Sequence, residues 1–481
     1  MPVAPLPARQ PLVGAEFPEG FVFGTATASY QIEGAVHEDG RGPSIWDTFS
    51  HTPGKVARGE TGDVACDHYH RWQSDLDLMA DYGVDAYRFS IAWPRIVPGG
   101  TGAVNQAGLD FYSRLVDGLL ERGIKPVATL YHWDLPQTLE DDGGWPVRGT
   151  ANAFANYAEL VGAALGDRVH QWTTLNEPWC SAYLGYAYGV HAPGRVDQEA
   201  SLRAVHHLNL AHGLGLQALR AAVSKPDALF SITNNLETLR PIDPDSEADV
   251  MAVARTRAMH NEVWTGPQLL GEYPQLAFDV TSHVTDWSFV LDGDLEAIRQ
   301  PIDVFGLNWY TPQWVGTGER QPGDADVRSM TPGLEGNRYA FPGNAEFTTM
   351  DWVIDDTGLT EMLVSLSKLV PGMALSVTEN GASQADVVDR DGQVHDPGRV
   401  DYFINHLSAV HRAIEQGANV TSYFAWSLLD NFEWSWGYER RFGITHVDYE
   451  TQLRTPKDSA KWYSKLARTR TIPSADPATW A

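Results

Sequence analysis

Hydrophobic and polar residues follow two alternating periods along the chain. Short runs rich in β-branched and aromatic residues, such as 21–27 and 86–93, have the pattern of buried strands. Longer segments follow with apolar residues at helical spacing. In 67–82 these are Trp72, Leu76 and Met79, and Gly83 ends the segment. The pattern therefore predicts strands and helices in regular alternation.

This alternation predicts eight strand–helix units in one series. The other expected strands are residues 126–133, 169–176, 228–236, 304–310, 374–379 and 420–429. The other expected helices are residues 106–122, 151–165, 202–223, 247–264, 359–370, 400–416 and 459–467. Eight βα units are the count of a TIM barrel, so we predict an α/β fold with a single (β/α)8 barrel. The expected catalytic domain covers residues 15–470, with terminal extensions at 1–14 and 471–481.

Two long stretches, 266–301 and 311–357, interrupt the series. Long loops within a compact domain usually carry function. The second stretch leaves the C-terminal end of a strand, which is the catalytic face of a TIM barrel. We therefore expect residues 311–357 to form part of an active-site wall.

Charge and composition narrow the class of protein. Of 481 residues, 43% are hydrophobic and 20% are charged, with a net charge of -27. A negative field repels phosphate backbones and anionic lipid headgroups, so neither nucleic acid nor a membrane is an expected partner. No apolar run reaches the ~20 residues of a membrane span, and no apolar signal core is visible, which indicates a cytoplasmic enzyme. The two cysteines, Cys66 and Cys180, fit neither a disulfide framework nor a metal knuckle, so we expect free thiols.

Two glutamates end expected strands of the barrel. Glu177 follows the fourth strand in Trp-Thr-Thr-Leu-Asn-Glu-Pro, and Glu379 ends the seventh in Leu-Ser-Val-Thr-Glu-Asn-Gly. Strands three apart in a ring of eight place their ends across the barrel mouth. Glycoside hydrolysis needs such a pair, in which one group protonates the leaving oxygen and the other works at the anomeric carbon. From the strand ends alone, a buried ion pair at each glutamate is an equally good interpretation.

Aromatic and amide side chains gather at the same strand ends. Sugars present apolar C–H faces, on which tryptophan stacks, and hydroxyls, which amide and carboxylate groups bind. A lone tryptophan more often fills a core, as we expect for Trp72 and Trp172. The strand-end groups are His132-Trp133-Asp134, Asn176, Asn308-Trp309-Tyr310, Trp426 and Asp430-Asn431-Phe432-Glu433-Trp434. Together with the two glutamates they favour a carbohydrate-cleaving site.

The ordered set of motifs resembles the family 1 glycoside hydrolases, the β-glucosidase family, from about Phe17 to Ala467. The motifs, in order, are 21–34 (Phe-Val-Phe-Gly-Thr-Ala-Thr-Ala-Ser-Tyr-Gln-Ile-Glu-Gly), 87–94 (Tyr-Arg-Phe-Ser-Ile-Ala-Trp-Pro), 131–136 (Tyr-His-Trp-Asp-Leu-Pro), 174–178 (Thr-Leu-Asn-Glu-Pro), 378–381 (Thr-Glu-Asn-Gly) and 426–434 (Trp-Ser-Leu-Leu-Asp-Asn-Phe-Glu-Trp). The chain departs from the family where the usual Trp-Glu is Trp352-Val353 and a usual proline is Asp356. That departure concerns the leaving-group side of the site.

The resemblance implies a retaining β-glycosidase that removes terminal non-reducing β-D-glucosyl residues from small glucosides and cello-oligosaccharides. It also implies side activity on β-galactosides and β-fucosides, without a cofactor or a metal. Glu177 would be the acid/base and Glu379 the nucleophile. The other implied roles are sugar binding by Gln31, His132, Trp133, Asn176, Trp426, Glu433, Trp434 and Phe442, orientation of the nucleophile by Arg88, Asn308 and Tyr310, and contact with the aglycone by Cys180, Asn235 and Trp352.

The two glutamates must differ in protonation at one pH. Arg88 beside Glu379 would favour the ionised carboxylate, while an apolar surround and the charge of Glu379 would raise the pKa of Glu177. The retaining route implies a carboxyl separation of ~5–5.5 Å.

Three alternatives remain open. A 6-phospho-β-glycosidase would bind a phosphate that the carboxylate of Glu433 disfavours. A non-catalytic sugar-binding barrel would keep the aromatic residues without hydrolysing. A metal-dependent hydrolase would need ligands such as His68, His70, His206 and His207, but residues one or two apart face different directions on a helix. The sequence is compatible with a monomer and with a homo-oligomer.

Overall fold

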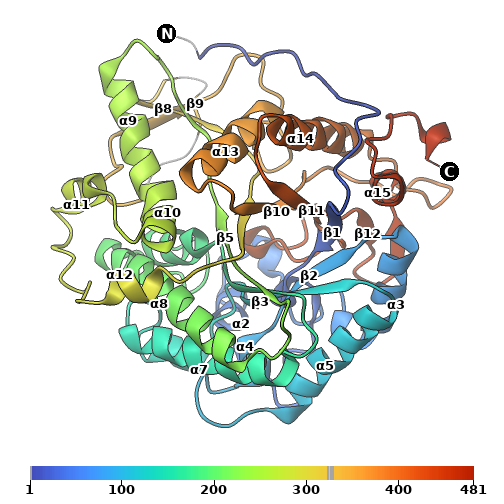
Figure 1. Ribbon diagram of the computed structural model, residues 1–481, viewed down its shortest axis with the longest axis horizontal. Coiled ribbons are helices and arrows are strands. Elements are labelled where there is room, and N and C mark those ends of the chain that lie inside the picture. Colours follow the sequence, from blue (N-terminus) through green and yellow to red (C-terminus); the bar gives the residue numbers. More distant parts are fainter. Residues whose placement is uncertain (1–2, 322–323, 326–329, 481) are drawn as a thin grey trace.

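The computed structural model describes residues 3–321, 324–325 and 330–480. Eight parallel strands form a closed barrel at its centre, in the ring order β1-β11-β10-β7-β5-β4-β3-β2 (Figure 1). The strands are β1 Val22–Ala26, β2 Ala86–Ser90, β3 Lys125–Tyr131, β4 Gln171–Asn176, β5 Leu229–Asn235, β7 Val304–Asn308, β10 Ala374–Asn380 and β11 Val420–Trp426. β1 pairs with both β2 and β11, which closes the ring and confirms the predicted TIM barrel.

A helix follows each barrel strand, and all of these helices except α9 (Glu247–Arg257) pack on the outside of the ring (Figure 1). They bury apolar stripes against the strands, as the 3.6-residue period predicted, whereas α9 packs on the small sheet that contains β6 Leu239–Pro241 and β8 Gln313–Thr317. The helices that follow the strands are α3 His68–Tyr82, α5 Gln106–Glu121, α7 Arg148–Leu165, α8 Gln198–Ala222, α9 Glu247–Arg257, α13 Asp356–Leu369, α14 Pro397–Glu415 and α15 Asp458–Thr469. Trp172 is fully buried, as expected of a core residue, whereas Trp72 is half-buried against the core.

Short elements occupy the connections. The helical ones include α1 Ser29–Ile32, α2 Ile45–Ser50, α4 Trp93–Ile96, α6 Gln137–Asp141, α11 Gln275–Thr281, α12 Asp294–Ile298 and the π-helical segments η2 Cys180–Ala187 and η4 Gly266–Leu270. Small sheets form from β6 Leu239–Pro241, β8 Gln313–Thr317 and β9 Asn337–Ala340, and from β12 Thr445–Val447 and β13 Arg454–Pro456. The two stretches interpreted from sequence as interruptions therefore contain helices and strands of their own.

The expected helix over 247–264 is present, but its hydrogen-bond pattern changes along its length. α9 ends at Arg257, a π-helical turn covers Ala258–Glu262, and α10 covers only Val263–Thr265. In that turn the Asn261 side chain accepts from the Glu237 N–H at 3.2 Å and donates to the Glu237 carbonyl at 2.9 Å. These bonds tie the widened turn to the chain just beyond β5, a long-range contact that helical periodicity does not encode.

The N-terminal segment packs against the connection that follows β7. Leu6 exchanges backbone hydrogen bonds with the Asn344 side chain, and Arg9 forms an ion pair with Glu346 at 2.6 Å. Figure 1 shows this segment running past α14. It therefore braces the same connection that carries Trp352.

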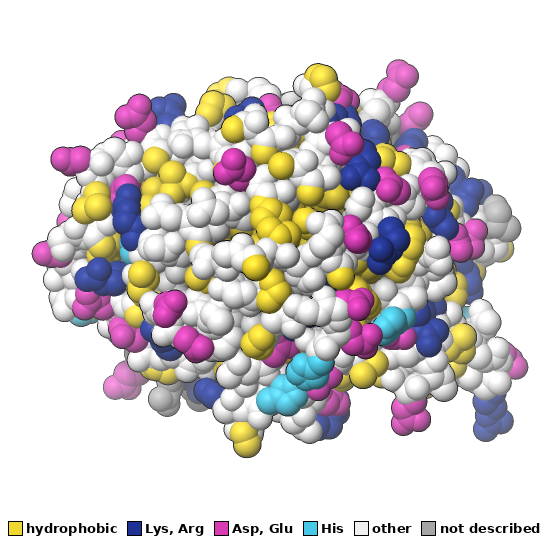
Figure 2. All heavy atoms as spheres, turned by 90° about the horizontal axis from the view of Figure 1, so that it is seen from below, with side chains coloured by type: hydrophobic (Ala, Val, Ile, Leu, Met, Phe, Trp, Pro, Cys, Tyr) yellow, Lys and Arg dark blue, Asp and Glu magenta, His cyan; other side chains and the backbone are white. Residues whose placement is uncertain are grey.

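The acidic excess is spread over the surface. On the face shown in Figure 2, Asp and Glu side chains are scattered and Lys and Arg side chains lie among them. Within the described ranges, no helix has the length and apolar character needed to cross a membrane.

Candidate active site

The two glutamates predicted from sequence lie at the carboxyl ends of β4 and β10. Both are almost fully buried, Glu177 at 6% and Glu379 at 3% exposure. Glu177 takes a φ of 45°, and the nearby Trp133 and Trp434 take 77° and 50°. Non-glycine residues in this left-handed region cost ~1–3 kcal/mol each, and such strain tends to gather where function fixes a side chain. The C-terminal mouth of the barrel is thus the candidate site.

Two donors hold the Glu379 carboxyl. Arg88 Nη1 donates to Oε1 at 2.5 Å, and Tyr310 Oη donates to Oε2 at 2.8 Å. Burial raises the pKa of Glu379 above its ordinary value, while the charge and hydrogen bond of Arg88 and the Tyr310 hydroxyl oppose that rise. Arg88 therefore favours the ionised form as expected, but burial outweighs it. All three side chains are placed where the sequence predicted.

The Glu177 carboxyl has different partners. Asn308 Nδ2 donates to Oε1 at 2.6 Å, and Cys180 Sγ donates to Oε2 at 3.2 Å. Burial raises the pKa of Glu177 to about 8, and the negative charge of Glu379 adds to the rise. Glu177 is thus the group that keeps its proton at neutral pH, as an acid catalyst requires.

Asn308 links the two carboxyls. Its register partner in β10 is Glu379, and its side chain also contributes a hydrogen bond that lowers the pKa of Glu379. Thr378 Oγ1 donates to Asn308 Oδ1 at 2.7 Å, which fixes the orientation of the amide and turns Nδ2 toward Glu177. The carboxyl separation of ~5–5.5 Å expected for a retaining site stays a prediction.

Asn176 and His132 form the next part of the site. Asn176 Oδ1 accepts from Arg88 at 2.6 Å and from Asn308 at 3.0 Å, so its Nδ2 faces His132 Nε2 at 3.0 Å. An amide N–H can only donate, so Nε2 accepts and the proton of the neutral imidazole is on Nδ1. Burial, with Arg88 nearby, holds the pKa of His132 well below its usual range. His132 Nδ1 has no hydrogen-bond partner among the described residues, which leaves an N–H for a ligand.

Gln31 and Glu433 lie together at the mouth, with Gln31 Nε2 3.5 Å from Glu433 Oε2. Gln31 Nε2 donates to Asn431 Oδ1 at 3.0 Å and to the Phe432 carbonyl at 2.9 Å, and its Oε1 is buried without a partner in the described structure. Burial raises the pKa of Glu433 to about 8, and the charges of Glu379 and Glu177 add to it. The sequence predicts a charged carboxylate at Glu433. In the buried mouth its pKa instead favours the protonated acid at neutral pH.

The predicted aromatic residues surround this polar centre. The His132 ring lies 6.0 Å from the rings of both Trp426 and Trp434, near parallel to each. Trp133 packs on Trp434 at 4.5 Å, but its indole N–H donates to the Asn176 carbonyl at 2.9 Å. The indole N–H of Trp133 is therefore occupied, so the contribution of Trp133 to a sugar site would come from its ring.

The predicted aglycone residues fall into two groups. Asn235 Nδ2 lies 3.8 Å from Cys180 Sγ, next to Glu177. Trp352 lies beside the other glutamate, 5.0 Å from the Tyr310 ring and 5.9 Å from Phe442. Phe442 is fully buried behind these rings, so it supports the wall.

Sequence reasoning missed a second polar group beyond Cys180. Gln313 Nε2 donates to Glu237 Oε1 at 2.6 Å, His260 Nδ1 lies 3.6 Å from Glu237 Oε2, and the His260 ring packs on Trp179 at 4.5 Å. Burial raises the pKa of Glu237 to about 8. Within the described residues, the Trp179 and His260 ring nitrogens Nε1 and Nε2 are buried without hydrogen-bond partners. Glu237 lies two residues after Asn235. That spacing from a predicted aglycone residue was the signal in the sequence that Glu237 lies near the same side of the site.

A steric contact accounts for the glycine at the last position of Thr-Glu-Asn-Gly, Gly381. A Cβ at this residue would lie 1.9 Å from the carbonyl oxygen of Trp426. No side chain fits there, because the contact is with backbone. The glycine thus lets the end of β10, with Glu379, lie close against the end of β11.

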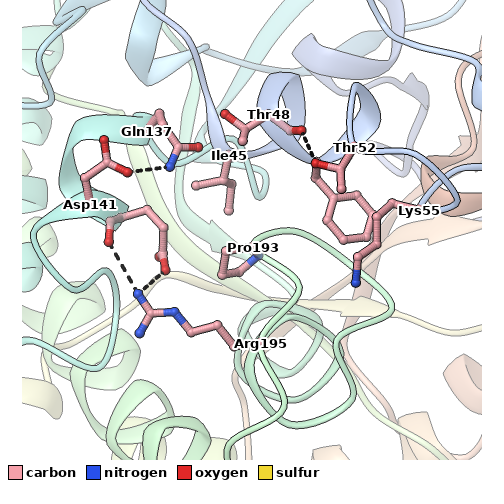
Figure 3. A pocket seen from close by; sticks show the side chains of 10 residues that line it. Ile45, Thr48, Thr52, Lys55, Gln137, Asp141, Pro193 and Arg195 are labelled. Atoms are coloured by element: carbon pink, nitrogen blue, oxygen red, sulfur yellow. Dashed lines mark hydrogen bonds and ion pairs between the residues drawn. The ribbon is translucent and has the colours of Figure 1, made fainter.

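A pocket of about 350 Å³ is lined by residues of the connections that follow β1, β3 and β4 (Figure 3). Its polar groups already pair with each other. Gln137 Nε2 donates to Asp141 at 2.8 Å, and Arg195 forms an ion pair with Glu140 at 2.5 Å. Neither Glu177 nor Glu379 lines this pocket, so it is separate from the candidate site.

The four histidines considered as metal ligands are dispersed. His68 contacts Asp75, His70 contacts Asp67, His206 contacts Tyr273 and Asp294, and His207 contacts the Trp145 carbonyl. No group of three or more His, Cys, Asp or Glu side chains in the described ranges is arranged to hold a metal ion. Cys66 and Cys180 are both free and buried.

The barrel mouth holds two buried carboxyls in different hydrogen-bond settings. Tryptophans surround them, together with polar atoms that have no partner among the described residues. These are the features of an enzyme that cleaves glycosidic bonds. The chain belongs to glycosyl hydrolase family 1, whose model matches residues 13–472.

Characterised relatives cover almost the whole chain. A bifunctional β-D-glucosidase/β-D-fucosidase of Bifidobacterium breve is 53% identical over 94% of this chain and 98% of its own length. A β-glucosidase of an Agrobacterium species is 47% identical over 95% of this chain and 96% of its own. The Thermotoga maritima β-glucosidase in complex with glucoimidazole superposes with a TM-score of 0.89 at 43% identity, covering 95% of this chain and all of that one.

Proposed function

We propose that this protein is a retaining β-glucosidase that removes terminal non-reducing β-D-glucosyl residues from small glucosides and cello-oligosaccharides. The observation that carries the proposal is the contrast between the two carboxyls. Arg88 and Tyr310 hold both oxygens of Glu379, whereas Glu177 has no cation in contact among the described residues and a pKa of about 8. One group is therefore prepared as a nucleophile and the other as an acid.

In the first step, Glu379 attacks the anomeric carbon and Glu177 gives its proton to the departing glycosidic oxygen. Both oxygens have a donor, Asn308 Nδ2 at Oε1 and the Cys180 thiol at Oε2, and we place the proton on Oε2 because the thiol is the weaker donor. A covalent glycosyl-enzyme forms on Glu379, and the aglycone leaves with the proton.

In the second step, Glu177 acts as a base. The ester on Glu379 no longer carries the negative charge that helped to raise the pKa of Glu177. That pKa falls, and the Glu177 carboxylate takes a proton from the water that attacks the anomeric carbon. The two displacements return the β configuration.

Unpartnered atoms support recognition of a sugar ring. His132 Nδ1–H can donate to a hydroxyl, and Gln31 Oε1 can accept from one. In the proposed complex, the second N–H of Asn176 donates to the 2-hydroxyl of the sugar. Trp426 stacks on the C–H face of the same ring.

A 6-phosphorylated sugar is disfavoured at this mouth. Burial and the charges of Glu379 and Glu177 raise the pKa of Glu433. No cation in the described part of the chain opposes that rise. A phosphate dianion would be buried there without a cation among the described residues to pair with it, beside acids whose ionisation is already disfavoured. A protonated Glu433 suits the neutral 4- and 6-hydroxyls of glucose, because it can both donate and accept a hydrogen bond.

The same site is compatible with more than one glycosyl group in the substrate. The B. breve relative bears a name for both β-glucoside and β-fucoside cleavage. We include β-fucosides and β-galactosides as side substrates in the proposal, because the hydroxyl network has neutral groups that tolerate a change at one position. Compartment and oligomeric state stay predictions from sequence.

The test is release of p-nitrophenol from its β-D-glucoside, followed by cellobiose against cellobiose 6-phosphate. The proposal expects hydrolysis of both neutral substrates and little of the phosphate, with kcat/KM falling above about pH 8 as Glu177 loses its proton. No hydrolysis would support the non-catalytic barrel, and a preference for the phosphate would replace glucoside by 6-phosphoglucoside.

A further inference from the structure

Two side chains hold Glu177, and they act on opposite oxygens. Asn308 is fixed with its N–H toward Oε1, because Thr378 occupies its carbonyl oxygen. The Cys180 thiol donates to Oε2 from 3.2 Å. Because a thiol is a weaker donor than an amide, the proton that Glu177 carries as an acid belongs on Oε2, where the thiol can turn to accept from it.

The local chain places Cys180 for this contact. It begins the π-helical segment η2, and its backbone N–H donates to the Glu177 carbonyl at 2.9 Å. On its far side, Asn235 Nδ2 approaches Sγ at 3.8 Å, so the sulfur has a donor behind it and the carboxyl in front. Burial, with Glu177 adjacent, raises the pKa of the thiol well above its ordinary value. Cys180 is therefore an S–H donor throughout the working range of such an enzyme.

We propose that Cys180 is a positioning residue that tunes the proton affinity of Glu177 by donating a hydrogen bond to Oε2 whenever that carboxyl is ionised. The inference rests on the proposed function, which gives Glu177 alternating acid and base roles. A donor to the carboxylate favours the base form needed in the second step. A thiol donates and accepts only weakly, so it assists the ionised form without locking Glu177 in it.

Other groups also act on Glu177 or on the thiol, and they lie on different elements. They are Glu379, Arg88, Tyr310, Glu433 and, facing Cys180, Glu237. A substitution at Cys180 leaves these side chains in place. A change in the pH profile on substitution therefore reports the thiol.

The experiment compares Cys180→Ala with Cys180→Ser. The pH dependence of kcat/KM for cellobiose, a poor leaving group, reports Glu177 as an acid. The pH dependence of kcat for 2,4-dinitrophenyl β-D-glucoside, whose second step limits turnover, reports it as a base. Loss of the donor in Cys180→Ala raises the pKa of Glu177, so both the basic limb of the first profile and the acid limb of the second move up by about one pH unit. Cys180→Ser keeps a donor and holds both limbs near or below their original positions.

Cys66→Ala is the matched control, because the Cys66 thiol is also buried but donates to the Asp430 carbonyl at 3.0 Å. It should leave both limbs in place. Unmoved limbs in Cys180→Ala, or equal shifts in the alanine and serine variants, would overturn the role of the thiol while hydrolysis by the unaltered protein kept the proposed function intact. An inactive unaltered protein would overturn both.

Discussion

Replacing Tyr310 by phenylalanine removes one hydroxyl and leaves the ring. The hydroxyl donates to Glu379 Oε2 at 2.8 Å, while Arg88 keeps its bond to Oε1 at 2.5 Å. The ring packs on Trp352 at 5.0 Å and on Phe442 at 6.1 Å, and phenylalanine preserves both contacts. Tyr310→Phe therefore isolates a single hydrogen bond to the proposed nucleophile.

The size of the effect follows from that bond. A hydrogen bond to a charged group contributes ~1.5–3 kcal/mol. Because the Tyr310 hydroxyl bonds to the ionised form of Glu379, its loss raises the pKa of Glu379 by ~1–2 units at 1.36 kcal/mol per unit. Glu379 must be ionised to attack, so the acid limb of kcat/KM should move to higher pH by the same amount.

The assay is the pH dependence of kcat/KM for p-nitrophenyl β-D-glucoside, which reports ionisations of the free enzyme. Tyr82→Phe is the matched control. Its buried hydroxyl bonds to Thr445 Oγ1 at 2.7 Å, outside the site, and its loss should leave the acid limb in place. An acid limb that stays put in Tyr310→Phe, or moves to lower pH, would refute the reasoning about Glu379.

Three further substitutions test other parts of the account. Glu177→Ala should keep a rapid first step on 2,4-dinitrophenyl β-D-glucoside and lose it on poor leaving groups; equal losses of kcat/KM on both would remove the acid role. Glu433→Gln should lower kcat/KM on glucosides. It should also raise Tm at pH 8 more than at pH 4, because the folded protein keeps a proton on Glu433 to about pH 8 that the unfolded chain releases at about pH 4; an equal Tm change at both values would contradict the raised pKa. Gly381→Ala should lower Tm and reduce kcat/KM at least ~10-fold, since its Cβ meets the Trp426 carbonyl at 1.9 Å. Gly149→Ala, whose Cβ has room within α7, should lower neither Tm nor kcat/KM.

The barrel and the main site residues could be predicted because they depend on local pattern. Each strand is a short buried run, and the side chains at its C-terminal end share one mouth. This places Arg88, Asn308 and Glu379 together before any contact is known. The long connections could not be predicted in the same way, because their strands β8 and β9 pair with each other and with β6 in a small sheet.

The electrostatics of the mouth also lay beyond the sequence. Glu433 appears in the sequence as a charged residue, yet its pKa depends on burial and on acids more than fifty positions away along the chain. The contact of Cys180 with Glu177 depends on how η2 begins, and a spacing of three residues does not specify it. The burial of a side chain, and with it its pKa, depends on residues from many parts of the chain, whereas a motif contains only residues adjacent in sequence.

The central claim is that Glu379 forms the covalent intermediate, and the most direct test is azide rescue of Glu379→Ala. With p-nitrophenyl β-D-glucoside, the variant should lose hydrolysis and regain turnover in sodium azide, giving α-glucosyl azide by a single inverting displacement in the space left by the carboxylate. Normal hydrolysis by the variant without azide, or rescue that yields the β-glucosyl azide, would contradict the assignment of Glu379 as the nucleophile.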